Sequence, residues 1–147
     1  MHETHAAPYL NIACCIDESD ASRFALSEAR RLRALGPGEL HVLHAPGDVI
    51  AYPAHPLTAW LRHPVELRAD AQRWLEEQIS VGETPIVLSG HPATAACEWA
   101  REAGCDLIVA AAHRSTAERA LLGGFASYLA YHAPCKVLLV RPHQRAV

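Results

Sequence analysis

The sequence reads Tyr-Leu-Asn-Ile-Ala-Cys-Cys-Ile-Asp-Glu-Ser-Asp-Ala-Ser over residues 9–22. Its first part, Tyr9 to Ile16, is short and mostly apolar, which is typical of a buried strand. Asp17-Glu-Ser-Asp then offers capping side chains and negative charge for the start of a helix. Apolar residues at helical spacing follow from Ala21 to Leu32, and Gly36-Pro37-Gly38 ends the helix. The stretch therefore predicts a strand that leads directly into a helix.

The rest of the chain repeats this alternation. Predicted strands and helices follow in the order Leu40–Ala45, Val65–Ile79, Pro85–Ser89, Pro92–Gly104, Asp106–Ala111, Gly124–His132 and Cys135–Val140. Five strands that alternate with four helices predict an α/β fold, a doubly wound parallel sheet with helices on both faces. The long irregular connection from Pro46 to Pro64 is either a functional lid or a mobile loop.

Length and composition indicate one globular domain. The chain has 147 residues, of which 50% are hydrophobic and 20% charged. This balance predicts a single domain over 1–147, with an ordered core over 9–142 and flexible ends at 1–8 and 143–147. The formal net charge of −3 argues against a nucleic-acid partner, which usually meets a basic face.

Membrane association and disulfide formation are not expected. The longest unbroken apolar stretch, Leu107 to Ala112, is too short to span a bilayer, and the N-terminus lacks a secretory signal. The five cysteines are odd in number and include no Cys-x-x-Cys pair. We therefore expect packed, reduced thiols and a cytoplasmic location.

A ligand site is expected beyond the carboxyl ends of the strands. Open doubly wound sheets bind ligands where the strand order reverses. Two loops qualify, Asp17 to Ser19 after the first strand and Ala112 to Gly124 after the fourth. The second leads into Gly123-Gly124, which favours either a close backbone approach to a phosphate or a plain turn at a helix start.

Five segments resemble the universal stress protein family, in the family's order. They are Ile12 to Ser22, Glu39 to Ala45, Gly90 to Ala95, Asp106 to Gly124 and His132 to Pro142. The resemblance implies a Rossmann-like fold with strand order 3-2-1-4-5. It also implies a cytoplasmic stress-response protein and a homodimer that pairs through the last strand.

Nucleotide binding divides this family. Members that bind ATP carry a loop of the form G-x2-G-x9-G-[ST] and an Asp at the end of the first strand that meets the adenosine. The resemblance carries this role to Asp17, and it places Ala45 where the family has a small apolar residue near the adenine. It assigns the phosphate loop to Ala111, His113, Arg114, Gly123 and Gly124.

The loop departs from the family pattern. Ala111 stands at the first glycine position. If a residue is deleted after His113, the final pair is Gly123-Gly124 and the hydroxyl is absent. Without a deletion, Arg114 replaces the second glycine and Phe125 replaces the hydroxyl. Either alignment reshapes the phosphate site, although Arg114 and Arg119 could supply compensating contacts.

Two functions follow from these departures. The favoured one is a non-catalytic regulatory domain that acts through dimerisation and contacts with unknown protein partners, without a required cofactor. The alternative is a switch that binds ATP, with Mg²⁺, through Asp17 and a variant loop. No catalytic residue is predicted beyond a weak case for His113 as a base in slow ATP hydrolysis. No metal site is predicted either, because His41 and His44 should face opposite sides of their strand.

Overall fold

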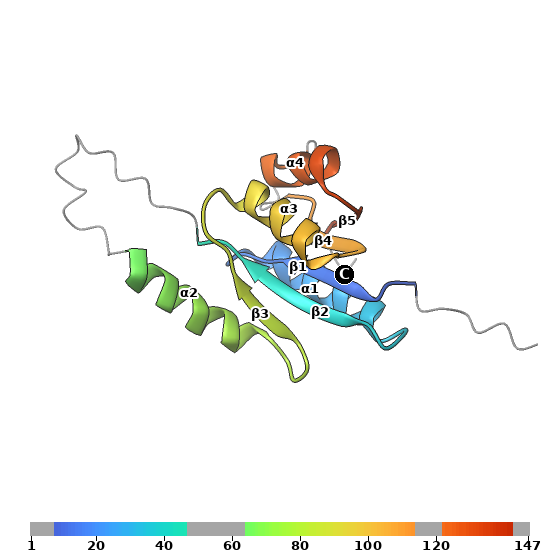
Figure 1. The fold of residues 1–147 in the computed structure, drawn as a ribbon, viewed down its shortest axis with the longest axis horizontal. Helices are drawn as coiled ribbons and strands as arrows, with labels where there is room; N and C mark the ends of the chain where they lie inside the picture. The colour runs from blue at the N-terminus through green and yellow to red at the C-terminus, as the bar shows by residue number, and fades with distance from the viewer. Residues whose placement is uncertain (1–7, 47–63, 114–121, 143–147) are drawn as a thin grey trace, which may run out of the picture.

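The strands form one parallel sheet, and the structure, a computed structural model, describes residues 8–46, 64–113 and 122–142. The order is β3-β2-β1-β4-β5 (Figure 1), as the family resemblance implied. The strands are β1 (Asn11–Cys15), β2 (Glu39–His44), β3 (Thr84–Val87), β4 (Leu107–Ala111) and β5 (Lys136–Val140). The strand order reverses between β1 and β4, which places the predicted switch point beside the end of β1.

Helices cover both faces of the sheet (Figure 1). They are α1 (Asp20–Arg33), α2 (Pro64–Gln78), α3 (Pro92–Ala103) and α4 (Gly124–His132). The core under α1 and α2 is centred on Ile12 and Val42, and the core under α3 and α4 is centred on Ala13 and Ile108. Within the described ranges, no helix is long and apolar enough to cross a membrane.

The strands are slightly shorter than predicted, but their pairing extends past their ends. Beyond β1, the Ile16 N–H donates to the Leu43 carbonyl at 2.9 Å. Beyond β3, the Leu88 N–H donates to the His44 carbonyl at 2.8 Å. The apolar runs in the sequence thus mark the extent of interstrand pairing. Most of the predicted Pro46–Pro64 connection lies outside the described residues.

Helix α3 shows why its ends could be predicted. Pro92 occupies the first turn, where its missing N–H costs no helical hydrogen bond. Gly104 ends the helix with φ +68°, a left-handed conformation that favours glycine. The stripe Ala93, Ala96, Cys97 and Ala100 is buried, as its spacing indicated.

The neighbouring cysteines of β1 point to opposite faces of the sheet. Cys14 packs in the core on the α1 side and Cys15 in the core on the α3 side. Burial raises the pKa of the Cys15 thiol to about 12, and burial also raises that of Cys14. Both thiols are therefore neutral near pH 7 and behave as small apolar groups, as predicted.

Candidate functional site

A cleft opens at the carboxyl ends of β1, β2 and β4. Its volume is about 850 Å³, which is within the range of small-molecule sites. The end of β1, the end of β4 and the start of α4 contribute to its walls, so the two loops singled out in the sequence meet there. Among the predicted site residues, the cleft is lined by Asp17, Ala45, Ala111, His113, Gly123 and Gly124. Arg114 lies outside the described residues.

The carboxylate of Asp17 is held in place by the chain around it. Its Oδ1 accepts hydrogen bonds from the Ser19 N–H and the Ser22 hydroxyl, each at 2.8 Å, and from the Ser19 hydroxyl. The Ser22 Oγ in turn accepts from the Asp17 N–H at 2.8 Å. Ser19 stands at the N-cap of α1 but makes no side-chain cap bond, because its hydroxyl turns to Asp17 instead. The orientation of Asp17 is thereby fixed before any ligand arrives.

The two glycines at the start of α4 keep the cleft open rather than bend the backbone. Gly123 is the N-cap residue with φ −62°, a value that any residue adopts. Its N–H donates to the Ala112 carbonyl at 3.0 Å. A Cβ built on Gly124 would meet no heavy atom of the described residues within 4 Å. These two positions therefore form the start of a helix, one of the two expectations from the sequence, and their missing side chains leave space in the cleft.

His113 is the most unusual polar residue of the cleft. It is only 6% exposed, and its Nδ1 finds no hydrogen-bond partner among the described residues. A buried, unpaired polar atom is costly and rare in folded proteins. The family resemblance assigned His113 to the phosphate loop, and the structure places it in the wall of the cleft.

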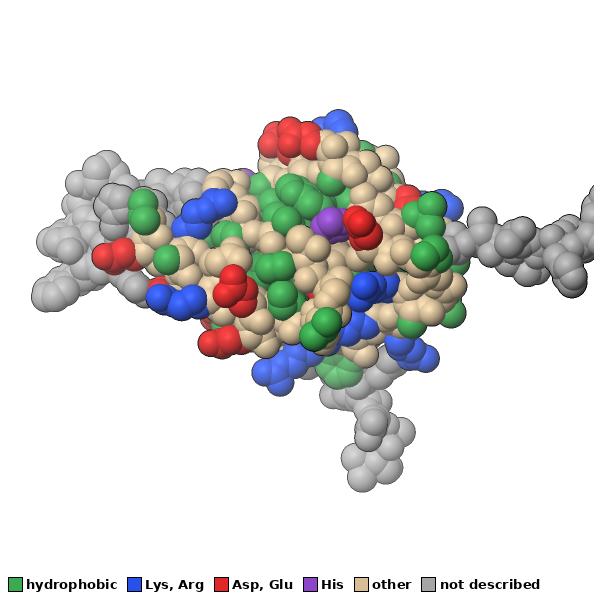
Figure 2. Space-filling model, turned by 60° about the horizontal axis from the view of Figure 1, so that its bottom comes forward, with side chains coloured by type: hydrophobic (Ala, Val, Ile, Leu, Met, Phe, Trp, Pro, Cys, Tyr) green, Lys and Arg blue, Asp and Glu red, His purple; other side chains and the backbone are tan. Residues whose placement is uncertain are grey.

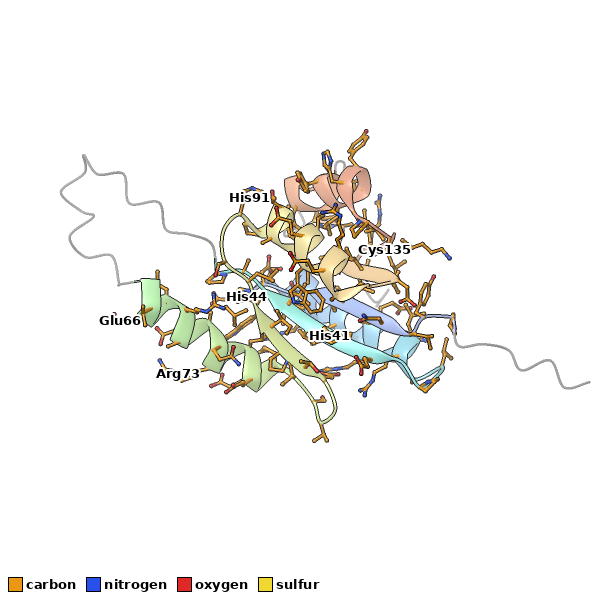
Figure 3. All side chains as sticks on the ribbon, viewed as in Figure 1. His41, His44, Glu66, Arg73, His91 and Cys135 are labelled. Carbon is orange, nitrogen blue, oxygen red and sulfur yellow. The ribbon has the colours of Figure 1, made fainter. Side chains whose placement is uncertain are left out.

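One wall of the cleft comes from α2, which sequence reasoning did not assign to the site. The ring of Trp74 lies 4.6 Å, centroid to centroid, from that of His44 at the end of β2. The His44 Nδ1 is 2.9 Å from the Ile16 carbonyl, which fixes the imidazole. Figure 3 labels His44 on β2. Trp74 and Asp70 both line the cleft. The spacing of apolar residues in α2 is that of a helix packed on a core, and nothing local indicates that Trp74 also borders a cavity.

Phe125 also lines the cleft, in the first turn of α4. The ungapped alignment placed it where ATP-binding relatives have Ser or Thr. Its aromatic side chain cannot supply the hydrogen bond that a hydroxyl gives to a phosphate. On that alignment, this wall is apolar where the family pattern has a hydroxyl.

A second, smaller hollow lies near the opposite end of the sheet. It measures about 340 Å³ and is lined by Arg30, Arg33, Ala34, Gly36, Pro37 and Gly38. Arg30 binds the Glu83 carboxylate with two hydrogen bonds, at 2.7 and 2.8 Å. Arg33 donates to the carbonyls of Gly38 and Gly82. Because both guanidinium groups already serve the fold, the larger cleft is the better candidate site.

The candidate metal ligands among the described residues and the charged side chains on one face of the molecule bear on two other kinds of site. The described residues contain no group of three or more His, Cys, Asp or Glu that could hold a metal ion. As expected, His41 and His44 face opposite sides, since His41 packs on Trp99 of α3 and His44 on Trp74 of α2. On the face in Figure 2, acidic and basic side chains lie among each other rather than in a uniformly basic field.

Solved structures of several organisms share this fold. The universal stress protein UspA from Lactobacillus plantarum is 24% identical, with a TM-score of 0.68 over 90% of this chain and 98% of its own. A universal stress protein in complex with cAMP is 22% identical, with a TM-score of 0.59 over 90% of this chain and 97% of its own. A family protein from Arabidopsis thaliana with AMP bound is 12% identical, with a TM-score of 0.59 over 91% of this chain and 92% of its own.

The sequence profile of the universal stress protein family covers almost the whole described chain. It matches residues 8–141, from just before β1 to just after β5. The match includes both walls of the cleft and every residue assigned to it. This chain belongs to the universal stress protein family.

Proposed function

We propose that this chain is a non-catalytic binding domain whose cleft holds an adenine nucleotide or nucleoside. The observation that carries the proposal is the open cleft of about 850 Å³ at the switch point. Departures in the loop sequence favoured a protein-contact domain without a bound nucleotide. That hypothesis is favoured if Arg114 or Phe125 fills the site. Among the described residues, no heavy atom lies within 4 Å of a Cβ built on Gly124.

The lining suits an adenosine moiety. Ala45 and Trp74 provide apolar surface for a purine ring, and Asp17 provides acceptor oxygens for sugar hydroxyls. The three hydrogen bonds that fix Asp17 lower the cost of ordering it on binding. Two universal stress proteins of the same fold hold cAMP and AMP, which supports the same ligand class here.

Calorimetric titration of the full chain with adenosine, AMP, cAMP and ATP tests the proposal. We expect at least one of these ligands to bind with a dissociation constant below about 1 mM and to raise the melting temperature. Asp17→Ala should weaken that binding at least about tenfold, because a hydrogen bond to a charged group is lost. The absence of binding and of any thermal shift for all four ligands would contradict the proposal.

Asp20→Ala is the matched control. Asp20 is a carboxylate in the first turn of α1, three residues after Asp17, but its side chain is 90% exposed and pairs only loosely with Arg23 at 3.8 Å. We expect this variant to bind as the unmodified chain does. Equal losses for the two variants would point to a general charge effect instead of a contact by Asp17.

We further propose that two copies pair through β5. Support comes from the composition of this edge strand, Cys135 to Val140 in the sequence prediction. Val137, Leu138, Leu139 and Val140 are only half-buried, and β5 pairs with β4 alone. An apolar edge strand invites pairing with another strand. Contacts with other proteins stay a prediction.

Sedimentation equilibrium tests the pairing. The unmodified chain should be dimeric, and Val137→Lys should shift it toward monomer because a charge then lies at the interface. Thr84→Lys, on the exposed opposite edge strand β3, is the control and should stay dimeric. A monomeric unmodified chain, or a Val137→Lys variant as dimeric as Thr84→Lys, would overturn this assignment.

A further inference from the structure

The fold decides which ring nitrogen of His44 carries a hydrogen. The His44 Nδ1 lies 2.9 Å from the Ile16 carbonyl oxygen, and a carbonyl oxygen can only accept a hydrogen bond. The Nδ1 atom must therefore carry the hydrogen and donate it. In a neutral imidazole the other nitrogen, Nε2, then has a free lone pair and acts as an acceptor.

Burial makes this arrangement of the His44 ring hard to reverse. The residue is 9% exposed, and the backbone around its partner is fixed, because the Ile16 N–H donates to the Leu43 carbonyl at 2.9 Å. The opposite tautomer would set the lone pair of Nδ1 against that of the Ile16 carbonyl and leave both acceptors without a donor. A buried polar group without a partner is costly, so Nε2 stays an acceptor.

The His44 Nε2 is open to the cleft, which His44 lines together with Trp74 and Ala45. Among the described residues, the ring makes one hydrogen bond, through Nδ1, and one ring contact, with Trp74. Two side-chain nitrogens in this part of the chain are buried without a partner, the Nδ1 atoms of His41 and His113, and neither belongs to His44. The Nε2 atom thus offers a fixed acceptor beside an apolar wall.

From this geometry we infer that His44 is a specificity-determining residue, through which the cleft selects a 6-aminopurine over a 6-oxopurine. The amine at C6 of adenine donates to the His44 Nε2. The carbonyl oxygen at C6 of hypoxanthine sets a second acceptor against it, and the locked ring cannot turn Nε2 into a donor. This inference rests on the proposed adenine-ligand function and names the residue that reads the base in the same cleft.

Calorimetry on the full chain compares each of the four adenine ligands with its 6-oxo counterpart, adenosine with inosine and ATP with inosine triphosphate. The titrations are run at pH 8, above the range in which histidine ordinarily titrates. We expect each adenine ligand that binds to do so at least about fivefold more tightly than its counterpart, the effect of one hydrogen bond. A smaller ratio would overturn the inference while leaving the proposed function intact. If no adenine ligand binds, the proposed function itself has failed.

His44→Asn separates the reading of the base from a structural role. Its amide keeps a donor for the Ile16 carbonyl but has no acceptor at the position of Nε2, so the adenosine-to-inosine ratio should fall below about twofold. A purely structural role would weaken both ligands alike and leave the ratio unchanged. His41→Asn is the matched control, because His41 lies on the same strand but packs on Trp99 outside the cleft, and it should keep the full ratio. A folded His44→Asn variant that also keeps the ratio would overturn the inference.

Nitrogen NMR of the unmodified full chain tests the contact even if His44→Asn does not fold. Long-range proton–nitrogen correlations distinguish a ring with hydrogen on Nδ1 from one with hydrogen on Nε2, and nuclear Overhauser contacts to Trp74 identify His44. We expect the Nδ1–H form, with an Nε2 resonance that moves when adenosine is added and with Nδ1 still protonated. The Nε2–H form, or an Nε2 resonance that is the same with and without bound adenosine, would contradict the inference.

Discussion

The two ends of the sheet handle their polar groups in opposite ways. At the amino ends of the strands, Asp106 accepts hydrogen bonds from the N–H groups of Leu10 and Asn11, and Arg30 and Glu83 form a two-fold hydrogen-bonded pair. At the carboxyl ends, a cleft stays open and the His113 Nδ1 has no partner within the described chain. The polar groups named at the amino end thus have partners within the chain, whereas the cleft at the carboxyl end is the site that we propose for a ligand. Stability and binding should therefore respond to different substitutions.

The largest expected effect is on stability and comes from Glu83→Gln. The Glu83 side chain is 2% exposed and its Arg30 partner 37% exposed. Removing the charge leaves Arg30 with a weaker partner, which should lower the free energy of unfolding by about 2–3 kcal/mol. The loss is smaller than for a fully buried pair because Arg30 reaches water. Urea unfolding measures the loss, and adenosine affinity should stay unchanged.

Glu28→Gln is the control for this substitution. Glu28 lies 3.7 Å from Arg31 on the surface of α1. Its removal should change the free energy of unfolding by less than about 0.5 kcal/mol. If both glutamine variants lose less than about 0.5 kcal/mol of unfolding free energy, the pair of Arg30 and Glu83 does not stabilise the fold as expected.

Asp106→Ala should be next in size. It deletes the two acceptor oxygens that hold the Leu10 and Asn11 N–H groups, at 2.7 and 3.1 Å, ahead of β1. We expect a loss of about 1–2 kcal/mol, since both bonds involve a charged acceptor but lie near water. Asp106→Asn keeps one acceptor oxygen and should lose about half as much. If Asp106→Ala weakened ligand binding without lowering the free energy of unfolding, the two ends of the sheet would not have separate roles.

Acidic pH should lower the free energy of unfolding through the protonation of Glu83. Burial alone would raise the pKa of Glu83, but the hydrogen bonds from Arg30 and from the Ser80 N–H, together with the charge of Arg30, lower it below its ordinary value of 4.5. A carboxyl whose pKa is lower in the folded state stabilises the fold above its ordinary pKa. This contribution is lost as the pH falls below about 4.5.

The stability difference between the unmodified chain and Glu83→Gln measures this contribution. We expect the difference to be constant from pH 7 to about pH 5 and to shrink at lower pH, because the glutamine variant cannot titrate. Urea unfolding at several pH values reports it. A difference that grows toward acid would show that the ion pair raises, rather than lowers, the pKa of Glu83.

The smallest stability effect is expected at the carboxyl end, from Ser22→Ala. Ser22 is 5% exposed and its hydroxyl both donates to and accepts from Asp17. Its loss should cost about 1 kcal/mol of stability but weaken adenosine binding several-fold, because the Asp17 carboxylate is then less well oriented. Ser27→Ala, exposed on the same helix, should change neither quantity. Unchanged adenosine affinity in Ser22→Ala would remove the positioning role.

Most of the fold was predictable because its signals are local. Apolar runs such as Leu107 to Ala111 identify buried parallel strands, and Pro92 and Gly104 mark the ends of α3 through their own backbone preferences. The predicted ends of the strands differ from the structure by only one or two residues. Pairing between segments, which no single segment encodes, sets those last residues.

The candidate site was predictable only in part. Asp17 and Gly124 were found because each follows a strand or begins a helix, and topology brings such positions together. Phe125 was noted only as a replacement in an alignment, and Trp74 was explained as packing. Their place in the cleft depends on how α2 and α4 sit against the sheet.

The sequence by itself determined the alternation of strands and helices along the chain, the turn at Asp17 and the helix start at Gly123 and Gly124. Residue type and spacing are enough to predict these features. Only the tertiary structure decided that Trp74 stands beside His44, that carboxylates border the cleft, and that the His113 Nδ1 is buried without a partner in the described chain. Burial and contact between distant segments arise when helices pack on the sheet. These tertiary contacts decide which ligand the proposed site can accept.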